Sequence, residues 1–167
     1  CSHRAIRASE HGGAPCPVEV KRRMLDWLGP IIWEAYGAAE AQGVIASPSQ
    51  WLARPGTVGK AIEGCTIKVL DESGAELPAH TPGLVYLTRH TGDRFEYRGD
   101  PAKTRSVHRG DFVTAGDIGY LDHDGFLYIL DRRDDLIISS GMNVYPADIE
   151  QVLVQHPDVA HCAMVGK

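Results

Sequence analysis

A short stretch at residues 36–40, YGAAE, has the composition of a ligand site. Tyr36 supplies a flat ring, Glu40 supplies a charge, and the small residues between them add little bulk. The stretch follows the apolar run Ile31-Ile32-Trp33, which is typical of a strand that leads into a loop. A surface turn is the simpler interpretation of the same residues. The sharper hypothesis is a ligand site that uses one ring and one carboxylate at the end of a strand.

Spacing excludes several other kinds of site. PGTVGKA at residues 55–61 resembles a phosphate loop, but the Walker pattern requires a glycine at Arg54 and a hydroxyl at Ala61. The sequence has no H-x-E, H-E-x-x-H or G-x-S-x-G, so metal and serine hydrolases have no support. The cysteines are far apart, which argues against zinc and a disulfide framework, and we expect buried free thiols in a reducing cytosol. They are Cys1, Cys16, Cys65 and Cys162.

The overall composition is that of an ordinary globular chain. Of its 167 residues, 43% are hydrophobic and 23% are charged, and the net charge is −5. The chain has no block of Lys and Arg, which argues against a nucleic-acid partner. No apolar run is long enough for a transmembrane segment, and the N-terminus has no signal-peptide core. We therefore expect a cytoplasmic protein.

The elements that position YGAAE are predicted to be a strand, a helix and a second strand. The first strand covers Arg4–Ser9, the helix opens at Pro17 and stops at Gly29, and the second strand covers Ile31–Ala35. In open α/β sheets, ligands collect at the carboxyl ends of such strands. The helix is predicted to bury the stripe formed by Val20, Met24 and Leu28.

The next part of the chain is predicted to be an antiparallel, barrel-like subdomain. Short β-like runs alternate there with turns, and LDESGAEL and LDHDGFL are both typical of strand–turn–strand units. Asp124-Gly125 suits a tight hairpin in the second of them. The predicted strands are Thr66–Leu70, Leu84–Arg89, Ile118–Leu121 and Phe126–Leu130.

A charge run, DRRDD at residues 131–135, separates this subdomain from a third part and suggests a hinge. A short strand at Leu136–Ile138, a helix opened by Pro146 and an apolar strand at Ala160–Val165 are predicted after it. The helix is expected to bury Ile149, Val152, Leu153 and His156. The predicted fold class is mixed α/β. We divide it into an α/β unit at residues 1–54, an antiparallel unit at 55–131, and a hinge with a truncated α+β unit at 132–167.

Four patterns occur in a fixed order along nearly the whole chain. They are HGGAP (11–15), YGAAE (36–40), TAGDIGYLDHDG (114–125) and DRRDDLIISSGMNVYPADIE (131–150). Singly, each is more typical of a turn, a surface or a core residue. Together they resemble the adenylate-forming enzymes, in particular the AMP-forming acyl-CoA and aryl-CoA ligases.

The resemblance implies a role for each matching residue. Glu40 would hold Mg²⁺ and belong to the catalytic set, and Asp134 would be the hinge between two catalytic arrangements. At the adenine, the resemblance places Gly13, Ala14 and Pro15 along the base, Tyr36 stacked on it and Gly37 in the turn. It places Ala39 at the α-phosphate, Asp117 at the ribose and Arg132 beside the nucleotide. For CoA, it places Gly141 at the pantetheine arm, with Ser140 and Asn143 beside it. Ala39 departs from the family, which has a threonine there. Loss of its hydrogen bond to a charged phosphate is worth roughly 1.5–3 kcal/mol.

The implied activity is that of an acyl-CoA synthetase that uses ATP, Mg²⁺ and CoA and acts on a small carboxylic acid, with fatty acid metabolism as the expected context. The family's phosphate loop would precede residue 1 and its catalytic lysine would follow residue 167, so we expect the 167-residue chain by itself to be inactive. A homodimer stays open. The alternatives are an adenylation domain that loads a carrier protein, and a degenerate module that binds AMP without catalysis.

Overall fold

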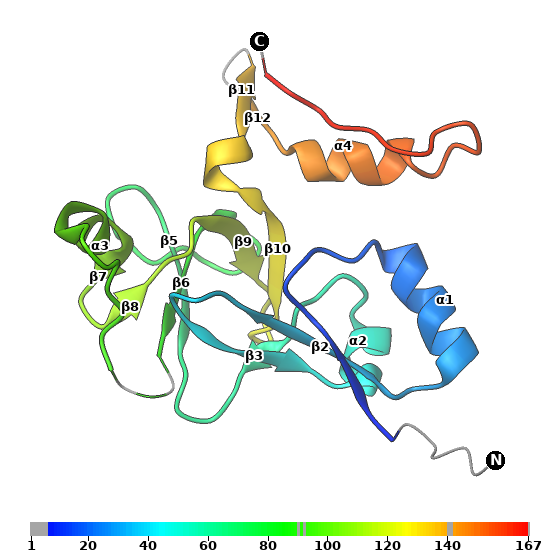
Figure 1. Cartoon of the computed structure of the whole chain (residues 1–167), viewed down its shortest axis with the longest axis horizontal. Helices are drawn as coiled ribbons and strands as arrows, with labels where there is room; N and C mark the ends of the chain where they lie inside the picture. Colours follow the sequence, from blue (N-terminus) through cyan, green and yellow to red (C-terminus); the bar gives the residue numbers. More distant parts are fainter. Residues whose placement is uncertain (1–6, 90, 92, 140–141, 167) are drawn as a thin grey trace.

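The structure is a computed structural model that describes residues 7–89, 91, 93–139 and 142–166 (Figure 1). Its first sheet has the strand order β1-β2-β3-β4. The strand β1 pairs in parallel with β2, and the remaining pairs are antiparallel. The elements are β1 (Ser9–His11), α1 (Val18–Leu28), β2 (Ile32–Gly37), β3 (Gln42–Ala46), α2 (Pro48–Ala53) and β4 (Lys60–Ala61). The predicted strand–helix–strand unit is thus present, and the mixed α/β class is confirmed.

The second sheet is antiparallel, as predicted, but it does not close into a barrel. Its order is β10-β9-β6-β8-β7, with β5 on the other edge of β6. Within the described residues the end strands β10 and β7 pair with β9 and β8 and not with each other. The elements are β5 (Ile67–Leu70), β6 (Gly83–Thr88), α3 (Pro101–Val107), β7 (His108–Arg109), β8 (Phe112–Val113), β9 (Asp117–Leu121) and β10 (Leu127–Arg132).

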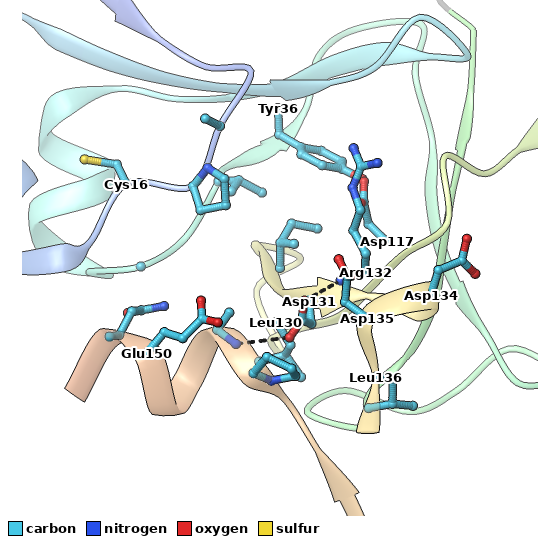
Figure 2. A pocket seen from close by; sticks show the side chains of 18 of the residues that line it. Cys16, Tyr36, Asp117, Leu130, Asp131, Arg132, Asp134, Asp135, Leu136 and Glu150 are labelled. Atoms are coloured by element: carbon cyan, nitrogen blue, oxygen red, sulfur yellow. Dashed lines mark hydrogen bonds and ion pairs between the residues drawn. The ribbon is translucent and has the colours of Figure 1, made fainter. Parts of the chain in front are cut away.

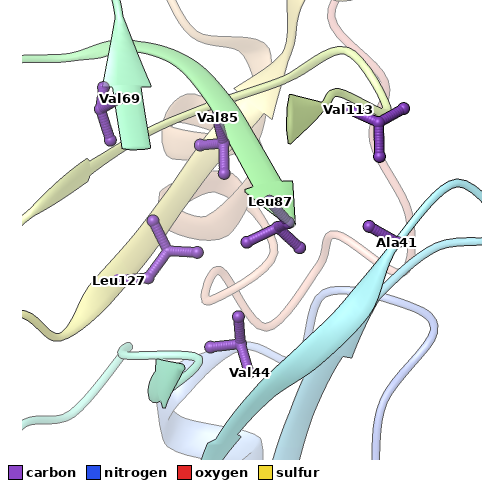
Figure 3. Close-up of a cluster of buried hydrophobic side chains, with 7 residues drawn as sticks. All are labelled: Ala41, Val44, Val69, Val85, Leu87, Val113 and Leu127. Carbon is purple, nitrogen blue, oxygen red and sulfur yellow. The ribbon is translucent and has the colours of Figure 1, made fainter. Parts of the chain in front are cut away.

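The two sheets meet where the chain at residues 57–59 crosses the start of β10. Leu127 exchanges backbone hydrogen bonds with this segment: Val58 N donates to its oxygen at 2.9 Å, and its N donates to Gly59 O at 2.8 Å. The buried Thr57 adds a side-chain hydrogen bond from Oγ1 to Leu127 O at 2.8 Å. Side chains from both sheets fill one core at this junction (Figure 3), namely Ala41, Val44, Val69, Val85, Leu87, Val113 and Leu127. The junction therefore fixes the first sheet against the second.

The last part of the chain lies to one side of both sheets (Figure 1). It consists of the 3-10 helix η1 (Arg133–Asp135), the hairpin of β11 (Ile137–Ser139) and β12 (Met142–Val144), and the helix α4 (Pro146–Leu153), which contacts β10. Described residues 160–165, predicted to form a strand, pair with no strand. No described helix is long and apolar enough to cross a membrane.

The predicted buried faces of both long helices are wrong. In α1, Val20 and Leu28 are 45% and 40% exposed, whereas Lys21 and Leu25 are buried. Of the predicted stripe, Met24 alone packs against the core, where it is half-buried. An ionic partner for Lys21, described below, has rotated the helix away from its apolar stripe. In α4, the predicted face is exposed at Ile149, Val152, Leu153 and His156, since within the described residues no layer covers it.

Three smaller predictions also need correction. Of the strand predicted at Arg4–Ser9, residues 4–6 lie outside the described part, and the strand that forms covers Ser9–His11. In LDESGAEL, predicted as a strand–turn–strand unit, the first strand β5 and the turn form, but a single bridge between Leu70 and Glu76 takes the place of the second strand. LDHDGFL forms the β9–β10 hairpin as predicted. The described cysteines Cys16, Cys65 and Cys162 are free, as expected. They are only half-buried, whereas full burial was predicted.

Gly59 offers a test of the junction between the sheets. Its φ is +115°, and a Cβ at this position would lie 2.1 Å from the backbone C and O of Ile45. We expect Gly59→Ala to lower the free energy of unfolding by roughly 2–5 kcal/mol, because strain and overpacking add. Gly110→Ala is the control, since its φ is also positive but its Cβ would meet open space. Thermal unfolding of the full-length protein measures both, and equal losses would contradict the junction's importance.

Candidate functional site

A cavity of about 900 Å³ opens between the two sheets and the last part of the chain. Figure 2 shows that its walls come from segments that are far apart in the sequence. The loop after β1, the C-terminal half of β2, the strands β9 and β10, the hinge region and α4 all contribute. Its lining includes Gly13, Ala14, Pro15, Cys16, Glu34, Ala35, Tyr36, Gly37, Trp51, Asp117, Asp131, Arg132, Asp134, Pro146 and Glu150. The site lies at the carboxyl ends of parallel strands, where α/β sheets bind ligands.

Most of the residues that the sequence predicted for the site line this one cavity. They are Gly13, Ala14, Pro15, Tyr36, Gly37, Asp117, Arg132 and Asp134. Ala39 lines a neighbouring cavity of about 760 Å³, whose lining also includes Tyr36. Glu40 lies in the lining of neither. Gly141 and Ser140 lie outside the described residues, and Asn143 is exposed on β12.

Tyr36 and Asp117, which both line the cavity, are joined by a direct hydrogen bond. The phenol O–H of Tyr36 donates to Asp117 Oδ2 at 2.6 Å, and Arg132 Nε lies 3.5 Å from Asp117 Oδ1. Burial, followed by the charge of the Asp117 carboxylate, raises the pKa of Tyr36. The phenol therefore stays neutral and donates. An ionised carboxylate has further lone pairs, so Asp117 can accept additional hydrogen bonds from a ligand that enters the cavity.

Two residues that the sequence did not predict hold the Glu40 loop. Arg89 Nη1 donates to the carbonyl oxygens of Ala39 at 3.1 Å and Glu40 at 2.9 Å. The phenol of Tyr97 donates to Glu40 Oε1. The contacting residues are about 50 positions apart in the chain, so no local pattern could have revealed them.

The chemistry of Glu40 fits a magnesium ion that takes most of its ligands from elsewhere. Tyr97 occupies Oε1, which leaves Oε2 as a hard oxygen donor. Within the described residues, no group of three His, Cys, Asp or Glu side chains could hold a metal ion. A single carboxylate is still sufficient for Mg²⁺, which commonly binds through one or two carboxylates together with water and phosphate oxygens.

Asp131 connects the hinge region to α4 and is a third residue that the sequence did not single out. Its Oδ1 accepts from Arg132 N at 2.8 Å, and its Oδ2 accepts from Ala147 N at 3.1 Å (Figure 2). The second bond satisfies an N–H at the start of α4, where the helix dipole favours a carboxylate. Asp134, by contrast, has a side chain that is 90% exposed. The carboxylate of Asp131 therefore sets how α4 approaches the cavity.

Comparison with known sequences identifies the family. The model of the AMP-binding enzyme family matches residues 2–91. The 2-succinylbenzoate–CoA ligase of Bacillus cereus is 38% identical over 164 residues, which cover 97% of this chain and 34% of that enzyme. The mitochondrial acyl-coenzyme A synthetase ACSM3 of Mus musculus is 36% identical over 158 residues, which cover 92% of this chain and 27% of that enzyme. This chain thus spans about a third of the length of these relatives.

Solved structures agree with the sequence comparison. The o-succinylbenzoate CoA synthetase MenE of Bacillus subtilis, in complex with the acyl-adenylate intermediate OSB-AMP, superimposes with a TM-score of 0.91. Its identity is 33%, and the match covers 98% of this chain and 34% of that one. The same enzyme in complex with ATP and a magnesium ion gives a TM-score of 0.89. The chain belongs to the AMP-binding enzyme family, which confirms the resemblance to adenylate-forming ligases.

Because the pKa values of Tyr36 and Tyr97 are raised, we predict that the free energy of unfolding falls at alkaline pH. The pKa of Tyr97 is raised to about 12 by desolvation and by its hydrogen bond to Glu40, and that of Tyr36 is raised as well. A raised pKa means that the folded state favours the neutral phenol, so this stability is complete below pH ~10 and is lost as the pH rises toward 12. Tyr97→Phe and Tyr36→Phe should each reduce the slope of unfolding free energy against pH in this window. Unchanged slopes in both variants would contradict these contacts.

Proposed function

We propose that the chain is the nucleotide-binding part of an AMP-forming carboxylic acid–CoA ligase. The observation that carries the proposal is the pairing of Tyr36 with Asp117 in one cavity beside the loop at residues 13–15. A ring, a carboxylate with free acceptor positions and an exposed loop of small residues suit a base, a ribose and close backbone approach. The relatives named above, two CoA ligases and one acyl-adenylate complex, support it.

In the proposed reaction, a carboxylate attacks ATP to give an acyl-adenylate and pyrophosphate, and the thiol of CoA then displaces AMP. Gly13, Ala14 and Pro15 lie along the adenine with Tyr36 on its other face. Asp117 accepts hydrogen bonds from the ribose hydroxyls, and Arg132, whose Nε lies 3.5 Å from Asp117 Oδ1, orients that carboxylate. Such chemistry depends mainly on positioning and on stabilisation of charge.

Glu40 is the residue that we propose as the Mg²⁺ ligand. When bound, the ion neutralises charge on the phosphates of ATP. The complex of MenE with ATP and magnesium supports this cofactor. The chain contributes the orientation of the ligand: Tyr97 holds one oxygen of Glu40, and Arg89 holds the backbone on which it is mounted.

The segment from residue 132 onward is proposed to rotate about Asp134 between the two half-reactions. The proposed units are those given above, with boundaries at residues 54 and 131. The exposure of Asp134 and its place in a single turn of 3-10 helix support a pivot there. The CoA contact at Gly141, the cytoplasmic location, the homodimer and the inactivity of the chain by itself stay predictions. The matched relatives act on unlike acids, so fatty acid metabolism is one proposed context among several.

The decisive test of the function is acid-dependent exchange between ATP and pyrophosphate. We expect the full-length protein to catalyse this exchange with at least one member of a panel of short, long and aromatic acids, and to require Mg²⁺. Glu40→Gln should raise the Mg²⁺ concentration needed for half-maximal rate, because the carboxylate is the proposed ligand. If the protein bound AMP but showed no exchange with any acid, it would be the alternative named above, a degenerate module that binds AMP without catalysis. The loss of the family threonine at Ala39 would be consistent with that alternative.

Ala39 provides a test of its own. We expect Ala39→Thr to raise kcat/KM for adenylation about tenfold or more, because a hydroxyl bound to a charged phosphate contributes roughly 1.5–3 kcal/mol. Ala39→Val is the matched control, since it has the shape of threonine without the hydroxyl. Steady-state exchange rates of the two variants in the full-length protein measure the effect. An unchanged rate in Ala39→Thr, or an equal gain in Ala39→Val, would refute the hydrogen-bond explanation.

A further inference from the structure

A buried ionic cluster lies directly behind the loop that lines the cavity. Lys21 is 1% exposed and donates from Nζ to Oε2 of Glu34, which is 6% exposed. The other oxygen of Glu34, Oε1, lies 3.1 Å from Nδ1 of the half-buried His11. Lys21 Nζ also lies 5.2 Å from the ring centroid of the buried Trp51, which lines the same cavity. None of these side chains has a role in the chemistry described above.

The cluster joins the three elements that surround the loop at residues 12–17. His11 is the last residue of β1, immediately before the loop, and Lys21 lies in α1, one turn after the loop. Glu34 lies on β2, two residues before Tyr36, and alternate residues of a strand share a face. Both ends of the loop are therefore tied through one carboxylate to the strand that carries Tyr36.

Stability alone does not account for this arrangement. Desolvation of two opposite charges costs about as much as their attraction returns, and apolar side chains of similar volume often stabilise a protein as well or better. Here the charged pair is buried while Val20 and Trp27 of the same helix are 45% and 82% exposed. The helix thus takes the rotation that the ion pair requires instead of the one that would bury its apolar residues. Such a pair instead fixes one orientation of α1 relative to β2.

The geometry fixed in this way is that of the slot between the loop and Tyr36. Gly12 packs so closely on β2 that a Cβ there would lie 2.8 Å from Ala35 O, so the loop has little freedom at its first residue. At its other end, the ion pair sets the position of α1. We propose that Lys21 and Glu34 are positioning residues that set the spacing between residues 13–15 and Tyr36, and thereby the affinity for the nucleotide base. This inference rests on the proposed function.

The test uses calorimetric binding of AMP to the full-length protein, together with the KM for the acid in pyrophosphate exchange. The main variant is Lys21→Met/Glu34→Leu, in which apolar side chains replace both charges and the fold is preserved. We expect its melting temperature to stay near that of the wild type and its Kd for AMP to rise about tenfold or more, since small misplacements are costly. The KM for the acid should change less than twofold. Glu34→Gln, which keeps the shape of the side chain, should show a smaller rise in the Kd for AMP.

The matched control is Lys68→Met, which removes an exposed lysine that pairs with Glu76 at 3.0 Å, away from the cavity. It should leave the Kd for AMP unchanged. If the double variant and Glu34→Gln bind AMP as the wild type does, the pair is structural and the inference is overturned. A parallel rise in the KM for the acid would also overturn it, because a general loosening would then explain the result. If the wild type itself binds no AMP, the proposed function fails, and this inference fails with it.

Discussion

The hydrogen bond between Tyr36 and Asp117 is the interaction on which the site depends. It joins β2 of the first sheet to β9 of the second, across 81 positions of sequence. The ring can face the cavity in a fixed orientation because its hydroxyl is anchored by the hydrogen bond that it donates to Asp117. The backbone crossing at Leu127 holds the two sheets at the separation that this bond requires. The shape of the cavity thus follows from how the sheets are joined.

The small residues of YGAAE now have a physical explanation beyond room for a ligand. A Cβ on Gly37 would lie 2.7 Å from the Cα of Gln42, and Ala38 N donates to Ala41 O at 2.8 Å, so the chain reverses very tightly. Arg89 reaches two carbonyl oxygens of this turn, which bulky side chains would obstruct. The turn and the candidate ligand site are therefore the same structure. The simpler interpretation as a turn was correct about the backbone, and the ligand hypothesis concerns what the turn presents.

The outcome of the helix predictions shows where local patterns stop being informative. The stop at Gly29 was predicted correctly, because a residue with φ of +81° at the end of a helix favours glycine regardless of tertiary context. The face of α1 was predicted wrongly, because periodicity treats a lysine as a surface residue and cannot include a carboxylate 13 positions away. The hairpin of LDHDGFL forms because the Asp122 side chain accepts from the N–H groups of its own turn. In both of these successes the partner was local in the chain.

The sequence by itself determined the family, the order of the four motifs that carry the resemblance, the mixed α/β class and most of the strands that carry the candidate site. These follow from short-range preferences and from patterns that stay adjacent in the chain. Only the tertiary structure decided that the second sheet remains open, that Arg89 and Tyr97 support Glu40, and that Lys21 is buried against Glu34. The reason is that hydrogen bonds and ion pairs between distant segments depend on how the sheets and helices are packed. That packing has no signature in the spacing of the residues that it brings together.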